Sequence, residues 1–223
     1  MSNKMDIQPL INMINPMLKG SLYTVQLFFV TLLISLPLGL CVTFLYTGRW
    51  IIIRKITGFY VLIMRGTPLL LQMFFVYFGL PFIPVIGPYL KFDAFTSAAI
   101  AFILNYAAYF AEIFRGGLLA IDRGQHEAAK VLGLTHFQTT YKIVLPQMFR
   151  VTLPSVSNEA LILVKDTALI TVLALHDLLS VSRTIVNATA SFVPFIVAGV
   201  FYLIMSYIVT VFFHALERKF SYE

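Results

Sequence analysis

The sequence predicts an all-α protein that crosses a membrane several times. Of its 223 residues, 59% are hydrophobic and only 12% are charged, whereas a soluble domain carries about 25% charged residues. Uncharged apolar stretches recur along the chain, and roughly 20 such residues in a helix cross a hydrocarbon core of about 30 Å. The excess of Lys and Arg, 16 against 10 Asp and Glu, fits cytoplasmic loops better than nucleic-acid binding.

Five transmembrane helices are expected, because polar residues interrupt the apolar sequence between them. Their expected ranges are 20–46, 56–80, 96–120, about 150–174 and 192–216. The segment 1–19 has apolar residues at helical spacing and is expected to lie at the membrane interface; a disordered tail is the alternative. This division makes 20–217 one transmembrane domain, followed by a short cytoplasmic tail at 218–223.

The distribution of basic residues predicts the orientation, because cytoplasmic loops are enriched in Lys and Arg. One side of the predicted topology holds Arg49, Arg54, Lys55, Arg123, Lys130, Lys142, Arg218 and Lys219. The other side holds Lys4, Lys19, Lys91 and Arg183. The C-terminus is therefore expected in the cytoplasm and the N-terminus outside.

The most polar stretch of the chain lies between the third and fourth expected spans. Its distinctive residues are Glu127, Ala128, Ala129, Gly133, Ile143, Leu145 and Pro146. The stretch Glu127-Ala-Ala-Lys-Val-Leu132 favours a helix with a small-residue surface, and Gly133 permits a sharp change of direction. Pro146 is expected to end the local helix before the chain re-enters the membrane. An ordinary surface helix with a glycine terminator is the alternative.

These residues resemble the EAA loop of ABC importer permeases, E-A-A, three residues, G, nine residues, I-x-L-P. The resemblance implies cytoplasmic coupling helices at about 124–146 that dock on an ATP-hydrolysing subunit. It implies two copies of that subunit, which would hold ATP and Mg, and a second permease copy or a homologous permease. An extracellular or periplasmic binding protein would deliver the substrate. The sequence contains no phosphate-binding G-x-x-x-x-G-K-[S/T] loop, which agrees with ATP hydrolysis in another chain.

Ionisable and amide residues within the expected spans are candidates for a substrate pathway, because such groups are costly at membrane depth. They are Arg65, Thr67 and Gln72 in the second span, Asn105, Tyr109 and Glu112 in the third, and Asn158, Glu159, Lys165 and Asp166 in the fourth. Arg65 and Gln72 are expected to share a helical face, as are Asn105, Tyr109 and Glu112. Structural roles are the alternative: a Glu112–Arg115 ion pair, an Asn105 bond to a neighbouring helix, or bonds of Lys165 and Asp166 across helices.

The segment Arg65-Gly66-Thr67-Pro68-Leu69 is similar to the R-G-T-P-L motif of the polar amino acid permeases within the ABC importers. The resemblance implies a non-enzymatic permease subunit for histidine-, glutamine-, arginine- or cystine-type substrates in the inner membrane of a prokaryote. A secondary transporter or channel is the alternative, but no inverted repeat is recognisable. A membrane-embedded enzyme would need a convergent catalytic set, and the His residues have no metal-ligand spacing.

Overall fold

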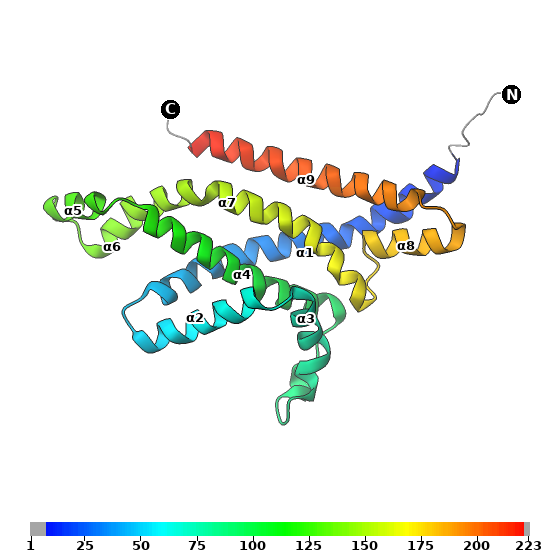
Figure 1. Ribbon diagram of the computed structural model, residues 1–223, viewed down its shortest axis with the longest axis horizontal. Helices are drawn as coiled ribbons and strands as arrows, with labels where there is room; N and C mark the ends of the chain where they lie inside the picture. Colours follow the sequence, from blue (N-terminus) through cyan, green and yellow to red (C-terminus); the bar gives the residue numbers. More distant parts are fainter. Residues whose placement is uncertain (1–7, 221–223) are drawn as a thin grey trace.

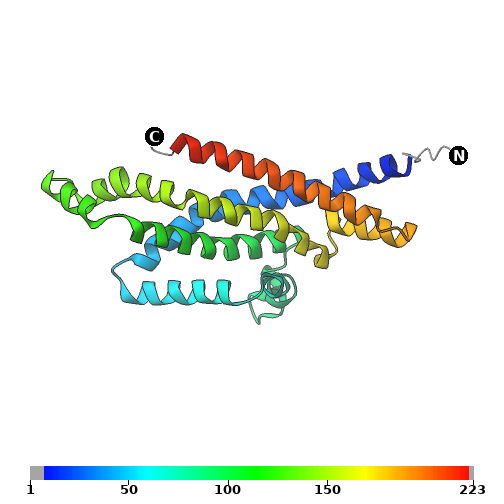
Figure 2. The ribbon, with the colours of Figure 1, turned by 45° about the horizontal axis from the view of Figure 1, so that its top comes forward.

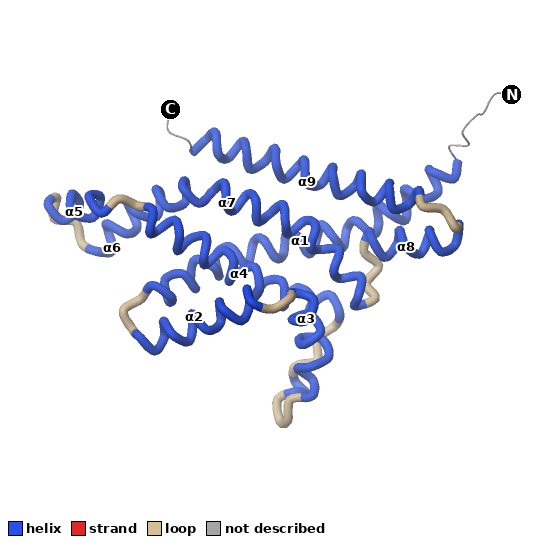
Figure 3. Tube along the Cα trace, viewed as in Figure 1, coloured by secondary structure: helices blue, strands red, loops and turns tan. Residues whose placement is uncertain are grey.

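The computed structural model describes residues 8–220, and the regular structure within that range is entirely helical (Figures 1 and 3). The longer helices are α1 (Gln8–Thr47), α2 (Ile51–Gly66), α4 (Ala94–Ala120), α7 (Leu145–Asp166), α8 (Leu178–Thr189) and α9 (Val193–Phe220). The shorter elements are α3 (Leu69–Phe74), η1 (Phe75–Gly79), η2 (Leu80–Phe82), η3 (Gly87–Tyr89), α5 (Arg123–Val131), α6 (His136–Thr139), η4 (Thr140–Val144) and η5 (Thr167–Leu173).

The long helices α1, α4, α7 and α9 form an elongated bundle, seen from two directions in Figures 1 and 2. Helix α4 is central and packs on α1, α2 and α7. Helices α5 and α6 lie at one end of the bundle, and α8 lies at the other. The bundle therefore separates the polar segment of the sequence from α8 by its full length.

Helix α4 can occupy the centre because its buried surface is rich in small residues. The fully or nearly fully buried alanines are Ala98, Ala99, Ala101, Ala107, Ala108 and Ala111. A Cβ atom added to Gly39 of α1 would lie 2.7 Å from Phe110 Cβ, so the two helices approach closely there. At the same crossing, Thr43 Oγ1 donates a hydrogen bond to the Ala111 carbonyl at 3.0 Å. Small residues and hydroxyl bonds of this kind are what hold helices together in a bilayer.

Within the described residues, three helices are long and apolar enough to cross a membrane: Met13–Thr47, Ala94–Ala120 and Val193–Phe220. The pair Ile51–Gly66 and Leu69–Phe82, bent by 108°, adds a fourth span if it is counted as one. Helix α7 is outside this set, since it carries Arg150, Glu159, Lys165 and Asp166. The all-α, multi-pass architecture is thus confirmed, whereas the number five remains a prediction.

The second expected span is not one helix, so the prediction that Arg65 and Gln72 share a helical face is wrong. Thr67 and Pro68 have extended backbone angles and separate α2 from α3. Proline disfavours a helical conformation in the residue before it. The preceding loop is also shorter than expected, because α2 begins at Ile51 and includes the basic residues Arg54 and Lys55.

The expectation that Pro146 ends a helix is also wrong. The chain is helical from His136 through a π-helical segment, η4, into α7, and Pro146 lies in the first turn of α7. Proline has no N–H to bond to the fourth residue before it. In the π-helical segment the Leu145 N–H instead bonds to the Thr140 carbonyl, five residues back. The wider turn accommodates the proline within a continuous helix.

The N-terminal segment joins the first long helix. Helix α1 runs without a break from Gln8 through Lys19 into the apolar stretch, although the expected segment also includes residues 1–7, which lie outside the described range. Near this end, Met17, Leu178 and Ala198 form a small buried cluster between α1, α8 and α9.

Gly117 and Gly116 offer a matched test of the crossing between α4 and α7. A Cβ at Gly117 would clash with Thr152 Cγ2 and lie 3.0 Å from Met148 Cγ, whereas one at Gly116 would meet nothing within 4 Å. Thr152 cannot rotate away freely, because its hydroxyl donates to the Met148 carbonyl. We expect Gly117→Ala to destabilise the protein by about 1–3 kcal/mol and Gly116→Ala to be neutral or slightly stabilising. Thermal unfolding in detergent measures both; equal melting temperatures would contradict the close crossing.

Candidate functional site

The side chains of Gln72 and Asn105 hydrogen-bond to the backbone at the break between α2 and α3. Gln72 Nε2 donates to the Met64 carbonyl at 2.9 Å and to Thr67 Oγ1 at 2.8 Å. Asn105 Nδ2 of α4 donates to the same Met64 carbonyl at 2.8 Å and to Gln72 Oε1 at 3.0 Å. In an unbroken helix the N–H of residue 68 would bond to Met64, but Pro68 has none. The amides of Gln72 and Asn105 therefore replace the missing backbone donor.

A group of charged and aromatic side chains lies beside this break. Glu112 Oε2 accepts hydrogen bonds from Arg115 Nε at 3.0 Å and Nη2 at 2.7 Å, so the Glu112–Arg115 ion pair, the structural alternative raised by the sequence, forms. Arg65 Nη1 approaches the same oxygen at 3.8 Å, and its guanidinium lies 5.3 Å from the centre of the Tyr109 ring. Arg65, Tyr109 and Glu112 thus come together across α2 and α4.

The candidate residues of α7 divide into two exposed and two partly buried side chains. Asn158 and Lys165 are exposed, whereas Glu159 and Asp166 are partly buried. Asp166 Oδ2 accepts a hydrogen bond from the Tyr106 hydroxyl of α4 at 2.8 Å. Glu159 lies within electrostatic range of both Asp166 and Arg65. Asp166 therefore links α7 to α4 by a hydrogen bond.

The polar stretch forms a capped helix, a turn and a second helix. Asp122 caps α5 by accepting a hydrogen bond from the Gly124 N–H at 2.6 Å. After α5, Gly133 adopts a φ of +73°, a left-handed conformation that glycine tolerates best. The Gly133 and Leu134 N–H groups bond back to the carbonyls of Lys130 and Ala129, and Thr135 with Gln138 forms a capping box that starts α6. Each turn is thus fixed by local hydrogen bonds.

Much of this segment is exposed, including Glu127 and Ala128, whereas Ala129 is fully buried. Its most exposed apolar side chains are Val131 at 88%, Leu132 at 76%, Phe137 at 76% and Tyr141 at 65%; these four define the coupling surface. The rings of Phe137 and Tyr141 stack with centroids 6.0 Å apart. Exposed apolar residues gathered in this way indicate a protein interaction site. The sequence prediction missed Phe137 and Tyr141, although their i,i+4 spacing was a usable signal.

The remaining residues of the pattern connect this segment to α7. Ile143 and Leu145 are partly buried, and Pro146 is exposed. Gln147 Nε2 donates to Gln125 Oε1 of α5 and to the Ile143 carbonyl, both at 3.1 Å. The base of α7 and the helix α5 are thus joined directly.

Metal binding receives no support from side-chain geometry. Between residues 8 and 220, His, Cys, Asp and Glu side chains form no group of three or more that could hold a metal ion.

The chain combines a multi-pass helical bundle, a polar break between α2 and α3 beside it and exposed apolar residues at one end, which are features of a membrane-embedded transport subunit. The chain belongs to the family of binding-protein-dependent transport system inner membrane components, whose pattern it matches over residues 35–222. It is a permease subunit of the ABC importer type, and this family implies a separate ATP-binding subunit and a partner permease.

Named relatives span nearly the whole chain. The arginine transport system permease protein ArtQ of Bacillus subtilis is 36% identical, covering 96% of this chain and 97% of its own length. The L-cystine transport system permease protein TcyB of the same organism is 33% identical, covering 92% of this chain and 86% of its own length. A glutamine transport system permease protein GlnP, assigned putatively in Rickettsia conorii, is 34% identical over 90% and 91% of the two chains.

Solved structures show the same fold. A crystal structure of an amino acid ABC transporter with histidines superposes with a TM-score of 0.86 at 29% identity, covering 97% of this chain and 99% of that one. The MetNI methionine ABC transporter in an inward-facing conformation gives a TM-score of 0.79 at 20% identity, covering 95% of this chain and 99% of that one. This match shows the fold alone.

The amide pair at the break is tested by comparing two asparagines. Asn105→Ala removes donors from the Met64 carbonyl and Gln72 Oε1, so we expect it to lower the free energy of unfolding by roughly 1–2 kcal/mol. Asn158→Ala, at an exposed position, is the control and should change the melting temperature little. Thermal unfolding in detergent measures the difference, and an unchanged Asn105→Ala variant would show that the break does not depend on this amide.

Proposed function

We propose that this permease imports a polar amino acid across the inner membrane of a prokaryote. The substrate class is inferred from one observation: cationic, acidic and amide side chains lie together at the break between α2 and α3 and along α7. A zwitterionic amino acid needs a partner for each of its charges in such surroundings. The names of the relatives, which include arginine and cystine permeases, support the same class.

In this proposal each charge of the substrate has candidate partners. Arg65 and Lys165 would bind the carboxylate, and Glu159 or Asp166 would bind the ammonium group or a cationic side chain. Amide and hydroxyl groups can bind either end. These further pathway candidates are Thr67, Gln72, Asn105, Tyr109 and Asn158, with Glu112 as an additional acidic group.

The coupling segment, formed by the expected coupling helices at about 124–146, would transmit the movement that ATP hydrolysis drives. Two ATP-binding subunits, holding ATP and Mg, would dock on the coupling surface and on Glu127, Ala128 and Gly133 of this chain and its partner permease. The partner would be a second copy or a homologous permease. The continuous helix from α6 through Ile143, Leu145 and Pro146 into α7 would carry the movement into the membrane as a rigid body. A binding protein would supply the amino acid from the opposite side.

We propose that the coupling end of the bundle faces the cytoplasm. The α1–α2 loop, the start of α2, the segment from α5 to η4 and the C-terminal end of α9 lie at this end. Together they carry Arg49, Arg54, Lys55, Arg123, Lys130, Lys142, Arg218 and Lys219. The positive-inside tendency supports this orientation, with the N-terminus outside and α7 as the fifth span.

Docking is tested with a pair of exposed apolar residues at the same end of the bundle. Leu132 and Trp50 are 76% and 74% exposed, but only Leu132 lies on the coupling surface. We expect Leu132→Ser to weaken binding of the ATP-binding subunit about tenfold, because a buried interface anchor contributes at least about 1.4 kcal/mol. Trp50→Ser should bind normally.

Binding of the purified ATP-binding subunit to membrane vesicles measures the effect, followed by ATP-driven uptake in proteoliposomes. Inside-out vesicles should bind the subunit and right-side-out vesicles should not, which tests the orientation. Equal binding by both variants would contradict the coupling surface, and uptake without ATP would favour a channel or secondary transporter.

The substrate pathway is tested with two carboxylates in different surroundings. Glu112 is already paired with Arg115, so Glu112→Gln should chiefly lower the melting temperature. Glu159→Gln should instead reduce uptake of cationic amino acids about tenfold more than uptake of neutral ones, because one charge pair is lost. Competition uptake assays and thermal unfolding of both variants measure this. A lower melting temperature with unchanged preference would assign Glu159 to a structural role.

A further inference from the structure

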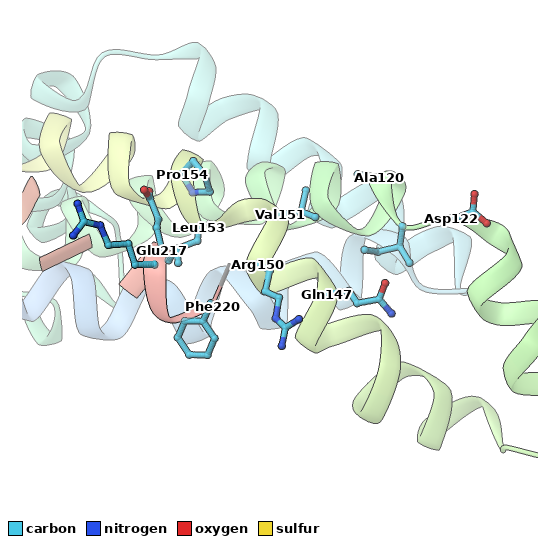
Figure 4. Close-up of a pocket in the computed structure, with 11 residues that line it drawn as sticks. Ala120, Asp122, Gln147, Arg150, Val151, Leu153, Pro154, Glu217 and Phe220 are labelled. Atoms are coloured by element: carbon cyan, nitrogen blue, oxygen red, sulfur yellow. The ribbon is translucent and has the colours of Figure 1, made fainter. Parts of the chain in front are cut away.

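A cavity of about 650 Å³, lined by both charged and apolar residues, lies at the end of the bundle near α5, where α4 ends, α7 begins and α9 ends (Figure 4). Gln147 and Arg150 of α7 line it, together with Asp122 after α4 and with Glu217 and Arg218 of α9. In the view of Figure 4 the Arg150 side chain extends between Gln147 and Phe220. The charged residues of the lining are two arginines and two carboxylates, so its charge is balanced.

An apolar groove of about 890 Å³ continues from this cavity. Arg150, Leu153 and Phe220 line both spaces. The groove then extends between α1, α7 and α9 and is lined by residues such as Leu33 and Phe212. The two spaces therefore form one site with a charged end and an apolar end.

The depth of the site in the bilayer follows from the helices that border it. Helices α4 and α9 both pass the criteria for a membrane span, and the cavity lies at the ends of both. This places the cavity at the level of the lipid headgroups and the groove in the hydrocarbon layer. An arginine side chain between membrane helices at this level can bind a lipid phosphate group.

The charges of the cavity distinguish between kinds of lipid. Arg150 and Arg218 can donate to a phosphate group, and the carboxylates of Asp122 and Glu217 can accept from an ammonium group. Glu217 Oε2 also lies 3.9 Å from His214 Nδ1 on the same helix. A purely anionic headgroup bound at Arg150 would meet the Glu217 carboxylate unfavourably, whereas a zwitterionic headgroup offers a partner to each.

We propose that this site binds an aminophospholipid, with its phosphate at Arg150, its ammonium at Glu217, and an acyl chain in the groove. The lipid would fill the space between the base of α7 and the end of α9, next to the coupling segment. This is a binding site for a membrane lipid, and it is separate from the substrate pathway and does not depend on transport.

The test uses the purified complex with its ATP-binding subunit, incubated with phosphatidylethanolamine and analysed by native mass spectrometry. We expect Arg150→Gln to lower the retained lipid about tenfold, through loss of a charge-assisted hydrogen bond, and Glu217→Gln to lower it in the same direction. Arg49→Gln, a change at an exposed position at the same end of the bundle, should retain lipid like the unaltered protein.

Tryptophan substitutions test the groove. Leu33 is 67% exposed and lines the groove, whereas Leu22 is 58% exposed and does not. Leu33→Trp should displace the lipid and Leu22→Trp should not. Lipid retention unaffected by Arg150→Gln, Glu217→Gln and Leu33→Trp would overturn the proposal. The absence of retained lipid in the complex, as expected if a second permease copy covers the site, would also overturn the proposal. Equal retention of phosphatidylglycerol would overturn the assignment to an aminophospholipid.

Discussion

The missing N–H of Pro68 is the constraint on which the central part of this structure depends. It leaves the Met64 carbonyl without a helical donor, and an unpaired carbonyl is costly in an apolar environment. Gln72 and Asn105 satisfy that carbonyl, so the chain can turn by 108° between α2 and α3. The same turn keeps Arg65 at the end of α2, where it meets Glu112 and Tyr109. The missing backbone donor of one residue thus brings together polar side chains of α2, α3 and α4.

Helix α7 connects the segment of α5 and α6 to Glu159 and Asp166 in one helix. It spans 22 residues, or roughly 33 Å at about 1.5 Å per residue. Its first turn is joined to α5 through Gln147 and Gln125, and its last residue, Asp166, bonds to Tyr106 of the central helix. A displacement at the coupling segment would therefore reach Glu159 and Asp166 through a helix rather than through a flexible loop.

The sequence was sufficient to predict the membrane class, the helical content and the position of the turn at Gly133, because these depend on composition and local conformation. The Glu112–Arg115 pair, which lies within one helix, was the structural alternative that the spacing left open. The sequence-based prediction failed at two prolines. Pro68 interrupts a segment that was predicted to be one helix, whereas Pro146 lies within a continuous helix because a π-helical turn precedes it. The joint role of Gln72 and Asn105 could not be predicted, since it requires the fold to bring positions 33 residues apart together.

The length of α1 has a consequence for the surrounding bilayer. Its 40 residues extend roughly 60 Å, about twice the thickness of a hydrocarbon core. A helix longer than the hydrocarbon core tilts or projects one end beyond the lipid. Because Gly39 and Thr43 pack α1 closely on α4, its tilt is shared with the central helix. Bilayer thickness therefore acts on the geometry of this subunit, and membranes of different composition would bias its conformational equilibrium.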